Sequence, residues 1–419
     1  MKIFHFVSRE THPPANPHAR KPRVIPIRVV EYCDHASFRN HAMNKTSALP
    51  SFRVLFAPTA LCLCVAAAMA GSLPDALSTP TPQRILFVGD SLTHGRYTPV
   101  RSYGASTSKI AVRGTVSVVD ENFGQTGARA EREPGPWGGI PGLFARFALE
   151  SGLDYDVHLE AMSATSLARH ARVASDVIDR PTWDAVVLQE LSAKPLPFAL
   201  THNRASDPPA FCASVAALAR GIRVAAPHAR VYLYETWPRA DLARTLAGEP
   251  ASDGFHARYL ARLAEIADAY RDAYDAARRG DPAIAGVAPV GRAWQRAWAT
   301  GVADPDPDAR SGAPLLWYGL HARNDPPISR PDYLHPGVAG AYLSALVLFQ
   351  QIAGVDVRTL GQHERAAARL GIAPDLAVRL QVVASDTVRQ ASAAADAAST
   401  AGRPDPCAPQ PGAALEPAD

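Results

Sequence analysis

The stretch RILFVGDSLTHGR, residues 84–96, runs from apolar residues directly into Gly89, Asp90 and Ser91. A short apolar run bounded by turn-forming residues predicts a buried strand that ends at Gly89. In an open α/β sheet, ligands bind at the carboxyl ends of the strands, so Ser91 lies where a catalytic group belongs. The alternative is a plain strand-to-loop turn, in which Asp90 and Ser91 only cap the next segment.

Further apolar runs of similar length follow at 155–161, 183–190 and 230–237, with a weaker one at 285–291. Amphipathic helical patterns separate these runs, for example IPGLFARFALESG and FHARYLARLAEIADAYRDAYDAARRG. Strands that alternate with helices are typical of a parallel sheet covered by helices on both faces. The sequence therefore predicts an α/β fold with a five-stranded parallel sheet.

One segment of this pattern is too long for a simple connection. Residues 97–139 form a Gly-, Pro- and Thr-rich insertion between the first strand and the first helix. Because long connections in compact domains are usually lids or binding loops, we expect the insertion to cover part of the active site. The main domain is predicted over 84–354, a helical extension over 355–400, and a disordered Pro/Ala-rich tail over 401–419.

The N-terminal region, residues 1–70, reads as a targeting sequence rather than as part of the fold. An apolar run over 54–70 follows Arg53 and ends in Ala-Met-Ala before Gly71, which is typical of a signal peptide with its cleavage site. Met43 opens a basic segment and is interpreted as the true start of translation. We expect export to the periplasm or medium without stable membrane insertion; the alternative is a membrane anchor formed by 54–70.

Charge and cysteine content narrow the possible functions. The net charge of +3 is concentrated at the N-terminus, where residues 1–70 hold nine Lys or Arg and only three Asp or Glu. The slightly acidic remainder predicts no nucleic-acid partner. Cys212 and Cys407 are the cysteines left after cleavage, and the sequence leaves open whether they pair. No cysteine or histidine spacing predicts a metal site, and no cofactor is expected.

The segment DYLHP, residues 332–336, supplies what a serine nucleophile requires. A serine needs a base to take its proton, and that base needs an acceptor that orients it. Asp332 and His335 are three residues apart, a spacing that places side chains together on a helical turn. We therefore predict that Ser91 is the nucleophile, His335 the general base and Asp332 its partner. His321 and Asp325 form a rival pair.

GDSLT near the start of the domain and DYLHP near its end together resemble the SGNH (GDSL) hydrolase superfamily, and the resemblance spans residues 84–354. It implies a flavodoxin-like three-layer α/β/α sandwich. It also implies hydrolysis of carboxylic esters through an acyl-enzyme, with Ser91, Asp332 and His335 as the catalytic residues.

The resemblance further implies an oxyanion hole built from the Ser91 N–H, a glycine N–H and an asparagine side chain. Here Ala164 occupies the glycine position and Gln189 the asparagine position, as in a branch with Gln in place of Asn. Ala164 still offers an N–H if its backbone does not require glycine, and Gln189 still carries an amide donor. If Gln189 is not the third donor of the oxyanion hole, Ser163 and Ser192 are the next candidates for that role.

Several other polar residues allow more than one interpretation. His94, His158 and His170 are predicted to be surface or supporting residues. Glu190 and Glu235 follow the third and fourth strands, so they are either structural or directed at the substrate.

The leading functional prediction is an exported serine esterase or deacylase acting on a small-molecule or glycan ester. One alternative is an acyltransferase on the same fold, and another is a non-catalytic carbohydrate-binding module. A metal-dependent phosphoesterase is disfavoured, because the sequence lacks the Asp, His and Asn clusters of a two-metal site. The sequence leaves open the acyl group, the alcohol and the oligomeric state.

Overall fold

A sheet of seven parallel strands, in the order β2-β3-β4-β1-β5-β6-β7, forms the centre of the molecule. β1 (Gln83–Gly89) lies between β4 (Tyr155–Ala161) and β5 (Ala185–Leu188). The side chains of residues 85–88 are completely buried, because helices cover both faces of the sheet. The computed structural model describes residues 81–131, 133, 135–308, 311–320, 327–397 and 404–408.

The five predicted strands are all present, the last two as β6 (Arg230–Tyr234) and β7 (Ile284–Ala288). Taken in chain order, these five are arranged 2-1-3-4-5, the order found in flavodoxin. The α/β class and the parallel sheet are confirmed, but the predicted number of strands is wrong. The insertion 97–139 adds β2 (Ala105–Ser106) and β3 (Val118–Asp120), which are too short to leave an alternating pattern in the sequence.

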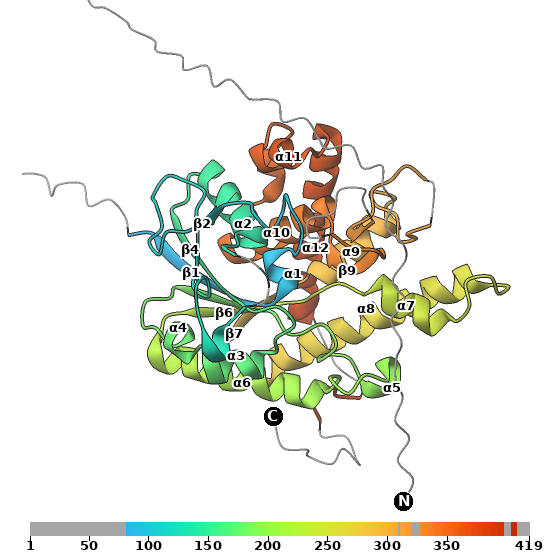
Figure 1. Cartoon of the computed structure of the whole chain (residues 1–419), viewed down its shortest axis with the longest axis horizontal. Coiled ribbons are helices and arrows are strands. Elements are labelled where there is room, and N and C mark those ends of the chain that lie inside the picture. Colours follow the sequence, from blue (N-terminus) through green and yellow to red (C-terminus); the bar gives the residue numbers. More distant parts are fainter. Residues whose placement is uncertain are drawn as a thin grey trace, which may run out of the picture. The chain divides into compact units, whose positions relative to one another are not determined.

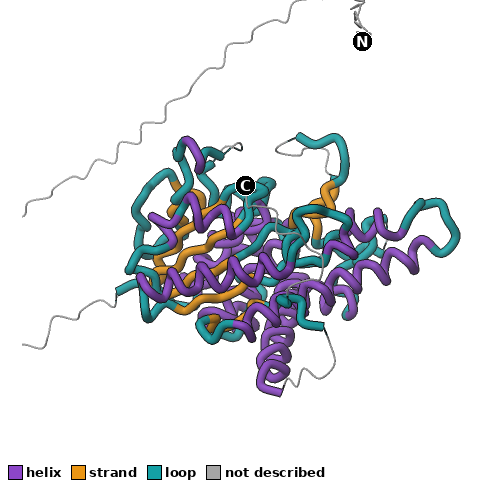
Figure 2. Tube along the Cα trace, turned by 90° about the horizontal axis from the view of Figure 1, so that it is seen from below, coloured by secondary structure: helices purple, strands orange, loops and turns teal. Residues whose placement is uncertain are grey.

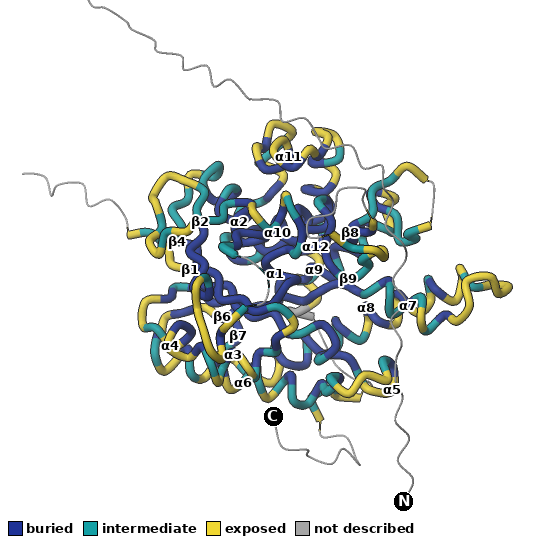
Figure 3. The backbone as a smooth tube through the Cα atoms, viewed as in Figure 1, coloured by how far each residue is buried: buried dark blue, intermediate teal, exposed yellow. Residues whose placement is uncertain are grey.

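One face of the sheet is covered by α2 (Gly139–Glu150) and α10 (Val338–Ala353), as Figure 1 shows. α12 (Pro374–Ala397) packs on α10. Nearly every residue of α10 is therefore buried, which is visible as the dark helix in Figure 3. Its sequence is apolar all round, as expected for a helix with the sheet on one side and another helix on the other.

The opposite face carries α3 (Leu167–Val173), α6 (Pro208–Ala225) and α8 (Phe255–Gly280). Figure 2, seen from below, shows helices running across the strands of the sheet. The remaining elements are short: α1 (Ser91–His94), η1 (Gly127–Arg129), α4 (Ser175–Ile178), α5 (Phe198–Thr201), α7 (Ala240–Ala247), α9 (Val290–Ala299), η2 (Val357–Leu360) and α11 (Arg365–Leu370). Among the described helices, none combines the length and apolar character that a membrane span requires. The predicted signal segment lies outside the described residues.

The DYLHP segment is a strand and not the helical turn that its spacing predicts. β9 (Asp332–Pro336) pairs antiparallel with β8 (Trp317–Gly319). Prolines at 331 and 336 disfavour helical backbone around the segment. The Asp332 carboxylate instead accepts hydrogen bonds from the N–H groups of Leu334 and His335, at 3.0 and 2.9 Å, so it still lies beside His335.

Cys212 of α6 and Cys407 form a disulfide with a Cα–Cα distance of 5.7 Å. The bond resolves the pairing that the sequence left open. It also attaches residues 404–408, which lie within the segment predicted to be disordered, to the body of the molecule. The domain boundaries proposed from the sequence stay predictions.

Candidate active site

The turn after β1 places Ser91 at the carboxyl end of the central strand. Asp90 caps α1, since its carboxylate accepts a hydrogen bond from the N–H of Leu92 at 2.9 Å. Ser91 is the first residue of that helix and is 6% exposed. Its Oγ lies 2.7 Å from Nε2 of His335, a residue 244 positions further along the chain. The change from apolar to polar residues therefore marks the end of β1. It places Ser91 in contact with His335.

The His335 ring is held on its other side by Asp332. Nδ1 of His335 lies 2.7 Å from Oδ2 of Asp332, while the Asp332 Oδ1 accepts the two backbone hydrogen bonds described above. Burial alone would raise the pKa of Asp332, but hydrogen bonds from His335 and Tyr97 and the His335 charge hold it well below its usual range. An ionised Asp332 requires the proton on Nδ1, which leaves Nε2 free to accept the Ser91 proton.

Tyr97 also belongs to this site, although no sequence pattern pointed to it. Its hydroxyl donates a 2.7 Å hydrogen bond to Oδ2 of Asp332, and its ring is 2% exposed. No motif marks this tyrosine, which follows the GDSLTHGR stretch at the start of the insertion. Its contact with Asp332, 235 residues away, could be found only from the tertiary structure.

Ala164 lies in the loop after β4 with a left-handed backbone, φ 54°. This conformation favours glycine, but alanine can adopt it at a cost of about 1 kcal/mol. The loop is held next to the nucleophile turn, because the N–H of Met162 donates to the carbonyl of Gly89 at 3.2 Å. The neighbouring Ser163 N–H is bound by the Glu131 carboxylate at 2.6 Å. Ala164 is thus the loop residue with the glycine-like backbone, and its oxyanion role stays a prediction.

Gln189 lies at the nucleophile turn, completely buried. Its Oε1 accepts hydrogen bonds from the Asp90 N–H and the Thr93 hydroxyl, both at 2.8 Å. Its Nε2 donates to the carbonyl of Glu190 at 2.6 Å. A Cβ on Gly89 would lie 2.5 Å from the Gln189 Oε1, so only glycine allows this close approach. The geometry favours a role in holding the turn, and the predicted oxyanion donation stays untested.

Glu190 and Glu235 are buried and bound within the protein, which favours the structural alternative. Both are at most 1% exposed. Glu190 accepts hydrogen bonds from the N–H groups of Leu167 and Leu191, and burial raises its pKa to about 7. Glu235 pairs with the guanidinium of Arg292 at 2.8 Å. The two strands end two and three residues earlier than predicted, and these carboxylates bind backbone or side-chain donors of the segments packed beyond them.

Two of the three histidines support the nucleophile turn. His94 is buried, stacks on Trp137 at 3.9 Å, and lies 3.2 Å from the Ser163 hydroxyl. His170 is also buried, and its Nε2 lies 2.9 Å from the Gly89 carbonyl. These positions are those of supporting residues rather than surface residues. Ser192 is the other candidate donor to the oxyanion, and its Oγ lies 3.4 Å from the Arg239 guanidinium.

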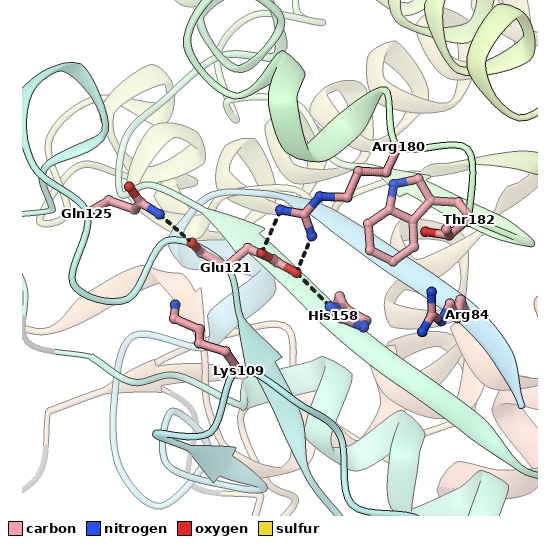
Figure 4. Close-up of a pocket in the computed structure, with 8 residues that line it drawn as sticks. Arg84, Lys109, Glu121, Gln125, His158, Arg180 and Thr182 are labelled. Carbon is pink, nitrogen blue, oxygen red and sulfur yellow. Dashed lines mark hydrogen bonds and ion pairs between the residues drawn. The ribbon is translucent and has the colours of Figure 1, made fainter.

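His158 belongs to a separate cavity of about 480 Å³, shown in Figure 4. Its Nδ1 lies 2.7 Å from the Glu121 carboxylate, which also binds Arg180 at 2.8 Å. On the other side, Nε2 of His158 lies 2.9 Å from Asp156. The charges at this cavity are therefore largely neutralised by one another. A more open hollow of about 530 Å³ lies beside Asp332 and Tyr97.

The rival pair His321 and Asp325 lies outside the described residues. No group of three or more His, Cys, Asp or Glu within the described part of the chain is arranged to hold a metal ion.

Comparison with known proteins gives distant structural similarities. No family model and no curated protein matches the chain in sequence. A GDSL-like lipase structure from Parabacteroides merdae is 16% identical, with a TM-score of 0.36 over 65% of this chain and 96% of that one. Phospholipase A1 from Streptomyces albidoflavus is 14% identical, with a TM-score of 0.33 over 64% and 98%. A variant of an acetyl-xylooligosaccharide esterase from Geobacillus Stearmophilus is 13% identical, with a TM-score of 0.35 over 64% and 93%. Similarities this low do not define an activity or a substrate.

Proposed function

We propose that the protein is a serine hydrolase of the SGNH (GDSL) type that cleaves carboxylic esters through an acyl-enzyme. The observation that carries the proposal is the buried contact of 2.7 Å between Ser91 Oγ and His335 Nε2, with Asp332 at 2.7 Å behind the imidazole. The intact contact also disfavours a non-catalytic binding module that merely keeps the fold.

The arrangement supports a two-step reaction. His335 takes the Ser91 proton as Oγ attacks the ester carbonyl, and the ionised Asp332 stabilises the imidazolium. The proton then passes to the departing alcohol, which leaves an acyl group on Ser91. A water molecule, deprotonated by His335, attacks this acyl group; as the bond to Ser91 Oγ breaks, His335 returns the proton to Oγ and the carboxylic acid is released. The N–H groups of Ser91 and Ala164 are the proposed donors to the oxyanion.

Fluorophosphonate labelling tests the reaction class, because the reagent phosphonylates activated serines. The wild-type protein should label on Ser91, and Ser91→Ala should abolish labelling. Ser91→Ala and His335→Ala should each remove most esterase activity, and the double variant should lose little more, because the residues act as a unit. Ser214→Ala, on α6, is the matched control. Labelling that survives Ser91→Ala, or additive losses, would contradict the proposal.

We also propose that the protein is exported and acts on small-molecule or glycan esters. The Cys212–Cys407 disulfide supports an oxidising compartment. N-terminal sequencing of secreted protein should then begin near Gly71, whereas retention of 54–70 in a membrane fraction would favour an anchor. Hydrolysis rates on p-nitrophenyl esters of increasing chain length and on acetylated glycans would identify the substrate class.

A further inference from the structure

The Asp332 carboxylate has every acceptor position occupied, and one of its two side-chain donors comes from outside the predicted triad. Oδ1 accepts the N–H groups of Leu334 and His335. Oδ2 accepts Nδ1 of His335 and the hydroxyl of Tyr97, each at 2.7 Å. A carboxylate with four donors in fixed directions cannot rotate without breaking several of these hydrogen bonds.

The Tyr97 ring is itself held in place. It stacks on Tyr318 with 3.6 Å between ring centroids and 11° between planes. It also meets the ring of His335 edge-on, at 6.1 Å and 88°. Tyr318 belongs to β8, the strand that pairs with β9, so the stack joins the start of the insertion to the hairpin that carries Asp332 and His335.

We propose that Tyr97 is a positioning residue of the hydrolytic site, whose hydroxyl holds the Asp332 carboxylate in the orientation that binds His335. The inference rests on the proposed serine hydrolase. The neutral hydroxyl also spreads the negative charge of Asp332, which weakens the attraction between the carboxylate and the imidazolium. Tyr97 therefore affects both the orientation of His335 and the negative charge that faces it.

The other charged and titratable groups near this pair stay in place when only the hydroxyl is removed. Asp90 and His94 interact electrostatically with His335 from the nucleophile side. Arg239 acts on Asp332 from the loop before α7, and the Arg96 guanidinium lies 5.9 Å from the Tyr97 ring. A change in pH dependence on loss of the hydroxyl can therefore be assigned to the Tyr97–Asp332 hydrogen bond.

Tyr97→Phe tests the inference, with ester hydrolysis followed from pH 4 to 9. We expect kcat to fall about tenfold, with KM changed less than about twofold, because the lost hydrogen bond is made to a charged group. The acidic limb of the kcat/KM profile should move to higher pH by about 0.5 unit. Tyr259→Phe is the matched control, since it removes a buried hydroxyl bound to the Pro305 carbonyl and should leave kcat and the limb unchanged.

A 3-fluorotyrosine at position 97 gives an independent test that keeps the ring and hydroxyl. Fluorine makes the phenol a stronger donor, so the acidic limb should move to lower pH. Wild-type kcat and limb position in both Tyr97 variants would overturn the inference, as would equal changes in Tyr259→Phe. Absence of labelling and hydrolysis in the wild-type protein would instead overturn the proposed function.

Discussion

At the residue scale, the hydrogen bonds of Gln189 decide how firmly the nucleophile turn is held. Its side-chain carbonyl accepts from Asp90 and Thr93, and its amide donates to a backbone carbonyl. The contact with Asp90 identifies the side-chain oxygen, because a backbone N–H can only donate. Gln189 thus connects the end of β5 to both sides of Ser91.

Replacing Gln189 with Leu should therefore reduce stability more than catalysis. The change leaves the Asp90 N–H and the Thr93 hydroxyl buried without acceptors, and the free energy of unfolding should fall by about 2–4 kcal/mol. We expect kcat of the folded protein to fall less than about tenfold. Denaturant unfolding and steady-state kinetics measure the two effects, and Thr93→Val is a milder control that leaves the Asp90 contact intact.

A different result would restore the oxyanion role of Gln189. In that case kcat would fall by about a hundred- to a thousandfold at nearly unchanged stability, since a lost oxyanion donor acts on the transition state.

Ala164 allows a second residue-scale prediction. Its φ of 54° costs alanine about 1 kcal/mol that glycine does not lose, although glycine has a more flexible unfolded chain. Ala164→Gly should therefore leave the free energy of unfolding unchanged or raise it by about 0.5 kcal/mol, with activity retained. Ala161→Gly, at the end of β4, is the control and should destabilise the protein by about 1 kcal/mol. Equal losses in both variants would contradict strain at Ala164.

At the element scale, the insertion 97–139 supports the site from several directions. Tyr97 binds Asp332, Glu131 binds the N–H of Ser163, and Trp137 stacks on His94. Arg129 forms a buried ion pair with Glu160 of β4. These contacts make the insertion part of the framework of the candidate active site; its predicted action as a cover stays a prediction.

Ionisable groups at the cavity in Figure 4 connect this insertion to β4. The stability of the protein should therefore depend on pH through these groups. Burial opposes the charge of His158, but hydrogen bonds with Asp156 and Glu121 outweigh it and raise its pKa above 6.5. Burial likewise opposes ionisation of Glu121, yet hydrogen bonds from His158 and Arg180 lower its pKa from 4.5 to about 2. The contribution of Glu121 to the free energy of unfolding is lost as the pH falls through about 2. The contribution of His158 is lost as the pH rises through its raised pKa.

We therefore expect Glu121 and His158 together to stabilise the folded protein fully between about pH 4.5 and 6.5. Thermal unfolding of wild type and His158→Gln across pH checks this. The difference in Tm should be larger at pH 5.5 than at pH 8.5. His228→Gln, an exposed histidine, is the control, and a difference that grows toward high pH would contradict the assignment.

At the scale of the whole molecule, the disulfide connects positions 195 residues apart in sequence. Closing so long a loop restricts the unfolded chain, which stabilises the folded state by about 2–4 kcal/mol in typical cases. The double variant Cys212→Ser/Cys407→Ser should lower the free energy of unfolding by about that amount, with kcat at 25 °C unchanged because neither cysteine contacts the triad. A variant as stable as wild type would contradict the disulfide in solution.

Local pattern was sufficient to predict the class of fold and the three residues, Ser91, Asp332 and His335, that the structure brings together. The strands around Ile85 and Val187 are short apolar runs between turn residues, and burial on both faces of a parallel sheet requires that pattern. Ser91, Asp332 and His335 stand in motifs whose residue types are dictated by the chemistry of a serine nucleophile.

Tertiary structure alone decided which side chains complete the site. The hydroxyl of Tyr97 binds Asp332, which lies 235 residues away in the sequence. The Gln189 amide binds the backbone of the nucleophile turn, 99 residues away in the sequence. β3 joins the sheet at the free edge of β4, and β2 pairs in turn with β3. Such contacts depend on where the chain folds back on itself, and a hydrogen bond between distant segments leaves no periodicity or spacing in the sequence.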